Sequence, residues 1–296
     1  MRTLSRSEWQ AAQARHEARV DRYVQPHLER RRRGRKHAVE DFLFEYYRVR
    51  PGRLRRWHPG AGVRLLDPDP TLHPTWRYYT TAPATPPPTT PHGQQAHVSV
   101  DLTAYLTERR GLVRHIHTLL AATADRTASY GCFGLHEWAM VYRAADDRRH
   151  PAPLRLGPRG TDEVVESMQI RCTHYDAFRF FTPEARPRNE FTPTRATEVD
   201  LEQPGCLHAG MDLYRFSAEL MPAVPSDLVL DCFEHAMRAR YIDMRASPYD
   251  LAALDLAPIR IETSTGRSEY VAAQKGLAAD AAVLRGRLHA ACAALL

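Results

Sequence analysis

Apolar positions near the start of the chain follow the spacing of a helix. Four of them recur at roughly helical intervals, namely Trp9, Ala12, Val20 and Tyr23. Ser7 and Gln10 have the spacing of a capping box, so we predict a helix over about residues 8–25, as far as Pro26. Residues 38–49 are aromatic on nearly every side, which predicts a short and largely buried second helix.

Helical spacing returns in the second part of the chain. One apolar stripe is formed by Leu102, Leu106, Leu112, Val113, Ile116, Leu119 and Leu120. Asp101 precedes this stripe and is expected to cap its helix. Further helices are predicted near residues 131–143, 161–168, 210–220, 226–244 and 268–296. Thr161 and Ser226 are the expected caps of two of them, and residues 97–101 and 168–172 are candidate short strands.

These patterns predict a mainly α fold, a helical domain with a few short strands. Strands and helices do not alternate along the chain, which argues against a parallel α/β sheet. Residues 81–94 are rich in proline and threonine and are expected to form an exposed loop or linker. The chain would then divide into a basic N-terminal helical lobe, residues 1–80, and a helical main domain, residues 95–296, or form one continuous domain.

The composition narrows the class of protein. No apolar run approaches the roughly 18 residues that span a bilayer, and the first 20 residues contain no apolar segment of a secretory signal. The five cysteines are far apart and include no C-x-x-C, which favours reduced thiols over a disulfide framework or a thiolate zinc site. We therefore expect a cytoplasmic protein without a membrane partner.

The positive charge is concentrated near the N-terminus. The formal net charge is +6, and all but two of the 41 basic residues are arginine. Residues 29–37 and 48–60 together hold eleven basic residues, which indicates an anion-binding surface with nucleic acid as the usual partner. A solvated face or an arginine-rich seam between domains is the alternative. The candidate DNA contacts are arginines 30–33, which include Arg31, Arg32 and Arg33, together with Arg53, Arg55 and Arg56.

Short motifs exclude several enzyme classes. The chain has no P-loop, no G-x-G-x-x-G and no G-x-S-x-G. "WHPGAGV" at 57–63 has the P-G-x-G of a helix-hairpin-helix, but three prolines interrupt the following residues, so an ordinary turn is favoured.

The segment "GCFGLHEWAMVYR", residues 131–143, carries the first candidate site residues. His136 and Glu137 are costly to bury without partners, and in a helix they point about 100° apart. They could flank the wall of a pocket, and Glu137 is the better candidate because the first turn of a helix favours a carboxylate. Alternatively, Glu137 pairs with a core arginine.

Two further segments combine histidine with aspartate. In an extended chain His174 and Asp176 project to the same face, and His208 and Asp212 share one helical face if their helix begins early enough. Three interpretations of these four residues remain open. They bind a divalent metal, they line a hydrogen-bonded polar pocket, or they are unrelated surface residues. The segment 243–250, "DMRASPYD", either lines the same pocket or, as we favour, caps a helix.

Six segments of the chain carry a family resemblance. They are "DFLFEYYRVRPGRLRRWHPG", "GCFGLHEWAMVYR", "HYDAFRFFTP", "LEQPGCLH", "MDLYRF" and "DMRASPYDL". Over residues 5–285 the chain resembles a family of bacterial, largely actinobacterial, proteins labelled 3-methyladenine DNA glycosylase. The resemblance implies DNA repair and a nucleoid-associated location, but it assigns no catalytic residue.

Together, the resemblance and the residues lead to one main hypothesis. The chain is expected to be a monofunctional N-glycosylase that excises alkylated, cationic purines from DNA without a cofactor; no protein partner is inferred. Its lysines, Lys36 and Lys275, are not well placed for Schiff-base chemistry. The catalytic candidates are His136, Glu137, His174, Asp176, His208 and Asp212. The aromatic candidates for contacts with the extruded base are Trp57, Trp138, Tyr142, Tyr175 and Phe178.

Two rival hypotheses remain. His174, Asp176 and His208, with or without Asp212, would bind a divalent metal in a hydrolase or a non-haem iron oxygenase. The third possibility is a non-catalytic DNA-binding protein, whose binding would be sensitive to salt.

Overall fold

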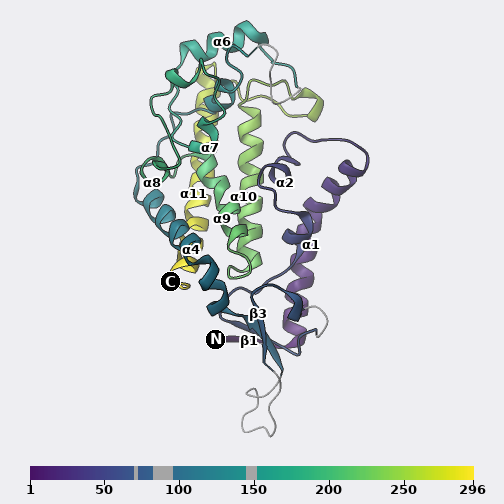
Figure 1. The fold of residues 1–296 in the computed structure, drawn as a ribbon. Coiled ribbons are helices and arrows are strands. Elements are labelled where there is room, and N and C mark those ends of the chain that lie inside the picture. The colour runs from purple at the N-terminus through teal and green to yellow at the C-terminus, as the bar shows by residue number, and fades with distance from the viewer. Residues whose placement is uncertain (70–72, 83–95, 145–151) are drawn as a thin grey trace.

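The computed structural model describes residues 1–69, 73–82, 96–144 and 152–296 (Figure 1). Long helices pack side by side in its centre, and a small sheet lies at one end, toward which both termini are directed. The predicted mainly α fold with a few short strands is confirmed. Of the expected loop at 81–94, all but the first two residues lie outside the described residues.

The first helix, α1, spans Arg6–Arg32 and differs from the prediction at both ends. Its capping box is formed by Ser5 and Glu8, not by Ser7 and Gln10, because Ser5 precedes the first helical turn and Glu8 returns to the Ser5 amide at 2.8 Å. The helix also continues through Pro26. Arg30, Arg31 and Arg32 are therefore helical, and Arg33 is the residue that caps the end of α1.

The small sheet has four strands, β1 (Arg2–Leu4), β2 (Val63–Leu66), β3 (Tyr79–Ala82) and β4 (His97–Val100). Their order is β1-β2-β4-β3, and only β1 and β2 are parallel. The strand predicted at 97–101 is confirmed as β4. Gly60, with φ of 89°, turns the chain into β2, and a Cβ there would lie 3.0 Å from Pro225. The "WHPGAGV" segment therefore leads into a strand, not into the second helix of a helix-hairpin-helix.

Four long helices form the centre, α4 (Leu102–Asp125), α9 (Leu207–Glu219), α10 (Ser226–Arg245) and α11 (Ser264–Ala293). In Figure 1, α9, α10 and α11 stand side by side, α4 packs along α11, and α1 lies on the other side against α10. The predicted cap Asp101 is confirmed, since its carboxylate accepts the Ala104 amide at 2.9 Å.

Two other predicted caps are wrong. α6 (Gly157–Ser167) begins before Thr161, whose hydroxyl donates to the Gly157 carbonyl inside the helix at 2.7 Å. Ser226 is the first residue of α10, and Pro225 takes the cap position. The Ser226 hydroxyl instead donates to the Arg56 carbonyl at 3.3 Å and accepts the His58 amide at 2.8 Å, so it ties α10 to the N-terminal segment.

Short elements connect the long helices. They are α2 (Phe42–Tyr46), α3 (Pro51–Arg55), α5 (Leu135–Ala139), α7 (Tyr175–Phe178), α8 (Glu198–Leu201) and three 3₁₀ turns, η1 (His73–Thr75), η2 (Arg186–Arg188) and η3 (Ala252–Leu254). The expected strand at 168–172 is reduced to a single bridge between Ile170 and Asn189. Asp176 lies in the first turn of α7, which begins at Tyr175, and His174 precedes the helix as its extended cap residue, so 174–176 is not an extended segment throughout.

The buried apolar side chains connect the two parts of the chain. The largest core joins Val20, Leu43 and Leu54 with residues from Tyr105 to Leu295. A smaller core lies against the sheet and consists of Leu4, Trp9, Trp57, Leu65 and Val98. The first 80 residues thus share the main core with the rest. All five cysteines are free thiols. No helix in the described ranges is long and apolar enough to cross a bilayer.

Candidate functional site

Three histidine rings from distant segments lie in a row at the start of α9. The His208 ring is 4.5 Å from the His136 ring and 5.1 Å from the His174 ring, centroid to centroid. Because α9 begins at Leu207, His208 and Asp212 lie one turn apart on the same face, as their spacing requires. Each outer histidine belongs to a buried network of charges, and His208 lies between the two networks.

The first network connects α5 with α10. His136 Nε2 is 2.8 Å from Asp243 Oδ1, and Arg240 Nη1 donates to both Asp243 Oδ2 at 2.6 Å and Glu137 Oε1 at 2.7 Å. All four side chains are buried. Gly134, with φ of 74°, provides the turn into α5 that directs His136 and Glu137 toward α10. The pairing of Glu137 with a core arginine, one of the two alternatives from the sequence, is therefore present.

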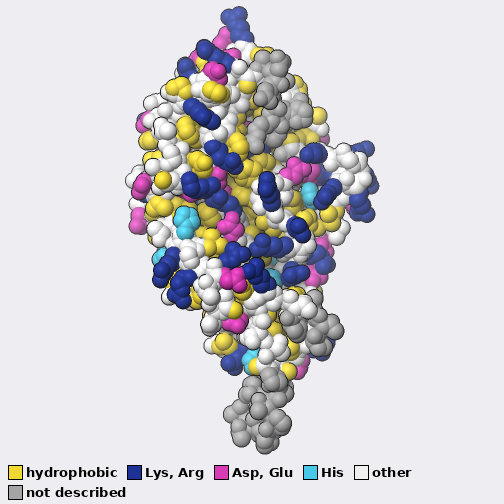
Figure 2. All heavy atoms as spheres, in the orientation of Figure 1, with side chains coloured by type: hydrophobic (Ala, Val, Ile, Leu, Met, Phe, Trp, Pro, Cys, Tyr) yellow, Lys and Arg dark blue, Asp and Glu magenta, His cyan; other side chains and the backbone are white. Residues whose placement is uncertain are grey.

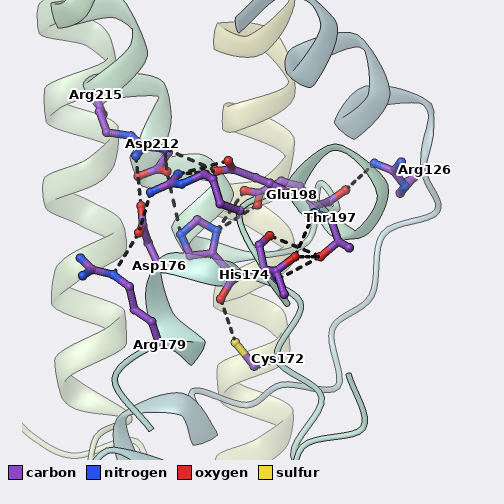
Figure 3. Close-up of polar contacts among 12 residues, drawn as sticks. Arg126, Cys172, His174, Asp176, Arg179, Thr197, Glu198, Asp212 and Arg215 are labelled. Atoms are coloured by element: carbon purple, nitrogen blue, oxygen red, sulfur yellow. Dashed lines mark hydrogen bonds and ion pairs between the residues drawn. The ribbon is translucent and has the colours of Figure 1, made fainter. Parts of the chain in front are cut away.

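The second network surrounds His174 (Figure 3). His174 Nδ1 lies 3.0 Å from Glu202 Oε2, and His174 Nε2 lies 3.9 Å from Asp212 Oδ2. Arg215 joins the two aspartates, with Nη2 2.6 Å from Asp212 and Nη1 3.0 Å from Asp176. Each buried carboxylate in this network therefore has a cationic partner.

The Asp176 carboxylate contacts three arginines. Besides Arg215, it contacts Arg179 Nε at 3.1 Å and Arg195 Nη2 at 3.2 Å. Arg195 and Arg215 also approach Glu198, at 3.2 Å and 3.6 Å. Such a network orients the Asp176 carboxylate firmly.

The three histidines differ in protonation. Burial by itself lowers the pKa of His136, but the Asp243 carboxylate outweighs it and holds this pKa well above its usual range. Glu202, with Asp212, likewise overcomes burial and raises the pKa of His174 to about 9. Burial and the positive charge of His136 hold the pKa of His208 well below its usual range. At neutral pH, a neutral imidazole therefore lies between two imidazolium ions.

A pocket of about 460 Å³ opens onto this row; we call it the site pocket. Its buried lining includes Glu137, Asp176 and Arg240, with partly exposed His208 beside them. Its aromatic lining consists of Phe42, Tyr46, Tyr47, Phe180 and Tyr249. Its exposed lining, which marks the mouth, consists of Glu45, Arg48 and Arg179.

All six catalytic candidates from the sequence belong to this one cluster. Glu137, Asp176 and His208 line the site pocket. The other three lie behind it, where His136 contacts Asp243 and where His174 and Asp212 face each other. Tyr47 joins the cluster by donating its hydroxyl to Asp212 Oδ1 at 3.0 Å.

The five aromatic candidates lie elsewhere, and none of them lines the site pocket. Trp57 belongs to the core beside the sheet, and Trp138 is fully buried with its indole N–H donating to the Ala246 carbonyl. Tyr142 donates to Glu166 at 2.8 Å, Phe178 packs on Phe181, and Tyr175 lies beneath the Arg195 guanidinium. All of these rings except the partly buried Tyr175 are buried in the core, because helical segments rich in aromatics turn their largest side chains inward.

The predicted DNA contacts fall into two groups. Arg31, Arg32 and Arg33 are exposed at the end of α1, where Figure 2 shows basic side chains gathered. Other basic side chains cross the middle of this face, interspersed with acidic ones.

The remaining predicted contacts have partners within the protein. Arg30 pairs with Asp41 and Glu40, and Arg55 pairs with Asp21 and Glu17. Arg53 donates to the Ala218 carbonyl at 2.8 Å, and the Arg56 guanidinium lies 5.5 Å from the centre of the Trp76 ring.

Sequence reasoning missed several residues of the site. Arg240 and Glu202 carry no recognisable motif, and Asp243 was expected to lie at a helix end rather than in the cluster. Asp250 does cap a turn, accepting the Ala252 amide at 3.0 Å. The aromatic segment 38–49 was expected to be largely buried, but Phe42, Tyr46 and Tyr47 are only partly buried and line the pocket. Arg48, with φ of 54°, follows Tyr47 at the mouth of the pocket.

Among the residues that the structure describes, two groups have atoms close enough to share a metal ion. They are His136 with His208 and Asp243, and His174 with Asp176 and Asp212, in each case with potential ligand atoms within 4.8 Å of one another. The second group contains three of the four predicted metal ligands. In both groups an arginine already contacts a carboxylate at 2.6 Å, through Arg240 or Arg215. A metal would therefore have to displace or share that carboxylate.

The chain was also compared with known proteins. No protein-family model matches it, and no match was found among curated proteins or solved structures. The resemblance to glycosylases therefore stays a prediction.

Proposed function

We propose that the site pocket receives an extruded purine and that the protein is a monofunctional DNA N-glycosylase for alkylated purines. The observation that carries this proposal is the chemistry of the pocket lining. Aromatic rings, a buried carboxylate and a neutral imidazole face one cavity, with arginines at its mouth. These groups suit a flat base attached to a phosphate backbone, because an extruded base is held by stacking and by hydrogen bonds to its edge.

The lining suits such a ligand in size and kind. A volume of about 460 Å³ lies within the range of small-molecule sites. Phe42 and Tyr46 are stacked on each other, with centroids 5.0 Å apart, and form an aromatic surface in the pocket. A purine alkylated on a ring nitrogen in DNA carries a positive charge, so such rings would favour it over the neutral base by about 0.5–2 kcal/mol. Arg48 and Arg179 would contact the flanking phosphates.

The buried polar groups would act on the bond between base and sugar. When the C1′–N bond breaks, its electron pair neutralises the cationic base and leaves a positively charged sugar. The carboxylates of Glu137 and Asp176 would stabilise that charge. Water would then add its oxygen to C1′ and pass its proton to the neutral imidazole of His208.

Schiff-base chemistry has weaker support than hydrolysis by water. Lys36 is exposed and lies 3.3 Å from Glu45 at the pocket mouth. Lys275 lines a different pocket. Neither lysine is buried among the groups that face the base, and a lysine nucleophile usually requires burial to be deprotonated at neutral pH.

Incubation with a methylated DNA duplex tests this function. We expect the wild-type protein to release free methylated purine, to leave the strand intact, and to form no covalent adduct with DNA under borohydride. The absence of free base from duplexes methylated at several purine positions would contradict the proposal. A covalent adduct trapped by borohydride would show that the enzyme forms a Schiff base, as a lyase does, and would contradict the hydrolytic step.

A metal-dependent hydrolase is the second candidate, favoured by the two groups of possible metal ligands. For this candidate, protein purified without chelator in media with added zinc, iron or manganese would contain about one metal per group, and the Asp212→Asn variant would contain less. For the glycosylase, we expect far less than one metal per chain under all these conditions and the same activity after dialysis against chelator.

A further inference from the structure

A second pocket lies apart from the site, between α4, α11 and the segment around Pro204. Its volume is about 510 Å³. Much of its lining consists of small apolar side chains, Ala121, Ala124, Ala128, Ala278, Ala279 and Ala282. Figure 1 shows α4 running beside α11, and alanines on these facing surfaces leave the space between them open. We call this the alanine pocket.

The alanine pocket contains a buried arginine that forms no ion pair within the described part of the chain, although Glu202 is close enough to act on its charge. Arg285 lines it and is only 2% exposed, and its Nη2 atom has no hydrogen-bond partner in the described part of the chain. The fully buried Arg240, by contrast, contacts two carboxylates. The nearby Glu202 is engaged by His174 instead. Because a buried cation without a partner is costly, Arg285 indicates that an anion binds there.

Other polar groups of the lining fit the same ligand. His289 Nε2 is also buried and has no hydrogen-bond partner among the described residues. Lys275 is exposed, with its ammonium 5.6 Å from the centre of the Tyr130 ring. The only carboxylate of the lining belongs to Asp125, which is exposed. The buried end of the pocket is therefore cationic, and its sides are apolar.

We propose that the alanine pocket binds a small organic monocarboxylate with an apolar body. The carboxylate would accept two hydrogen bonds from Arg285, a geometry that the planar guanidinium favours. The apolar body would cover the alanines, and its volume would suit a cavity of about 510 Å³. This site is separate from the site pocket and does not depend on the proposed glycosylase activity.

Titration calorimetry with the 296-residue chain tests the class of ligand. Octanoate is the probe, 1-octanol is its uncharged analogue, and inorganic phosphate is an anion without an apolar body. We expect octanoate to bind with one site per chain and at least tenfold more tightly than either of the others. Equal affinity for octanol would indicate a merely apolar groove, and binding of phosphate alone would indicate another ligand class. Either result, or no binding at millimolar octanoate, overturns the proposal.

Variants then test the role of Arg285. Arg285→Met is expected to weaken octanoate binding about 30-fold, as for the loss of a charge-assisted hydrogen bond, and to unfold no earlier than the wild type without ligand. Arg287→Met is the matched control, because Arg287 lies on the same helix and pairs with Asp231 outside the pocket. Ala282→Phe should fill the pocket and block binding without removing a charge. Unchanged affinity in both Arg285→Met and Ala282→Phe would contradict the proposal.

Discussion

Replacing Arg240 with methionine is expected to lower the free energy of unfolding by about 3–5 kcal/mol. Its guanidinium is 1% exposed and contacts both Glu137 and Asp243. Methionine fills a similar volume but removes the guanidinium from two buried carboxylates, of which Asp243 keeps the His136 imidazolium as partner. Urea denaturation at pH 7 measures the change.

Arg238→Met provides the control for this prediction. Arg238 lies two residues earlier on α10 and forms an exposed ion pair with Asp280 at 2.8 Å, so its loss should cost less than about 1 kcal/mol. A decrease in the free energy of unfolding of Arg240→Met as small as that of Arg238→Met would show that the buried network does not stabilise the protein.

Replacing His208 with glutamine is expected to reduce the rate of base release by about 10²–10⁴-fold, the usual contribution of a general base. The described residues show no hydrogen bond from either His208 nitrogen to another side chain, so the folded state should lose little stability. Because the pKa of His208 lies well below 6.5, the neutral form persists as the pH falls. The wild-type rate should therefore stay level from pH 8 to 6.5 and fall only at lower pH.

A surface histidine provides the matched comparison. His115 is exposed on α4 and does not line the site pocket, so His115→Gln should retain the wild-type rate. If His208→Gln also retains it, a water activated by another group must carry out the reaction.

The site could be predicted in part because local spacing carries information about faces. His208 and Asp212 are four residues apart, and this spacing places them on one side of α9 once the helix starts at Leu207. His136 and Glu137 were notable because both are costly to bury. The partners Asp243 and Arg240 lie more than 100 residues away on α10. Periodicity reveals which face of a helix is buried but not which other helix it meets.

The aromatic lining illustrates the same limit. The sequence favoured Trp138 and Tyr142, which lie next to the site in the chain but pack into the core. The rings that line the pocket, among them Phe42 and Tyr46, come from a short helix in the first fifty residues.

The start of a helix was predicted wrongly where two polar residues were both candidates for the cap. Ser5 and Ser7 both precede the apolar pattern of α1, and only their backbone geometry decides which one caps it.

The central claim is that the site pocket stabilises a positively charged sugar during loss of the base. The most direct test is the affinity for a duplex in which one deoxyribose is replaced by a cationic pyrrolidine, relative to a duplex with an uncharged tetrahydrofuran at that position. We expect the wild-type protein to bind the cationic duplex at least about 100-fold more tightly, because this duplex resembles the transition state. Glu137→Gln should lose most of that preference. Equal affinity of the wild-type protein for the two duplexes at the same salt concentration would contradict this claim.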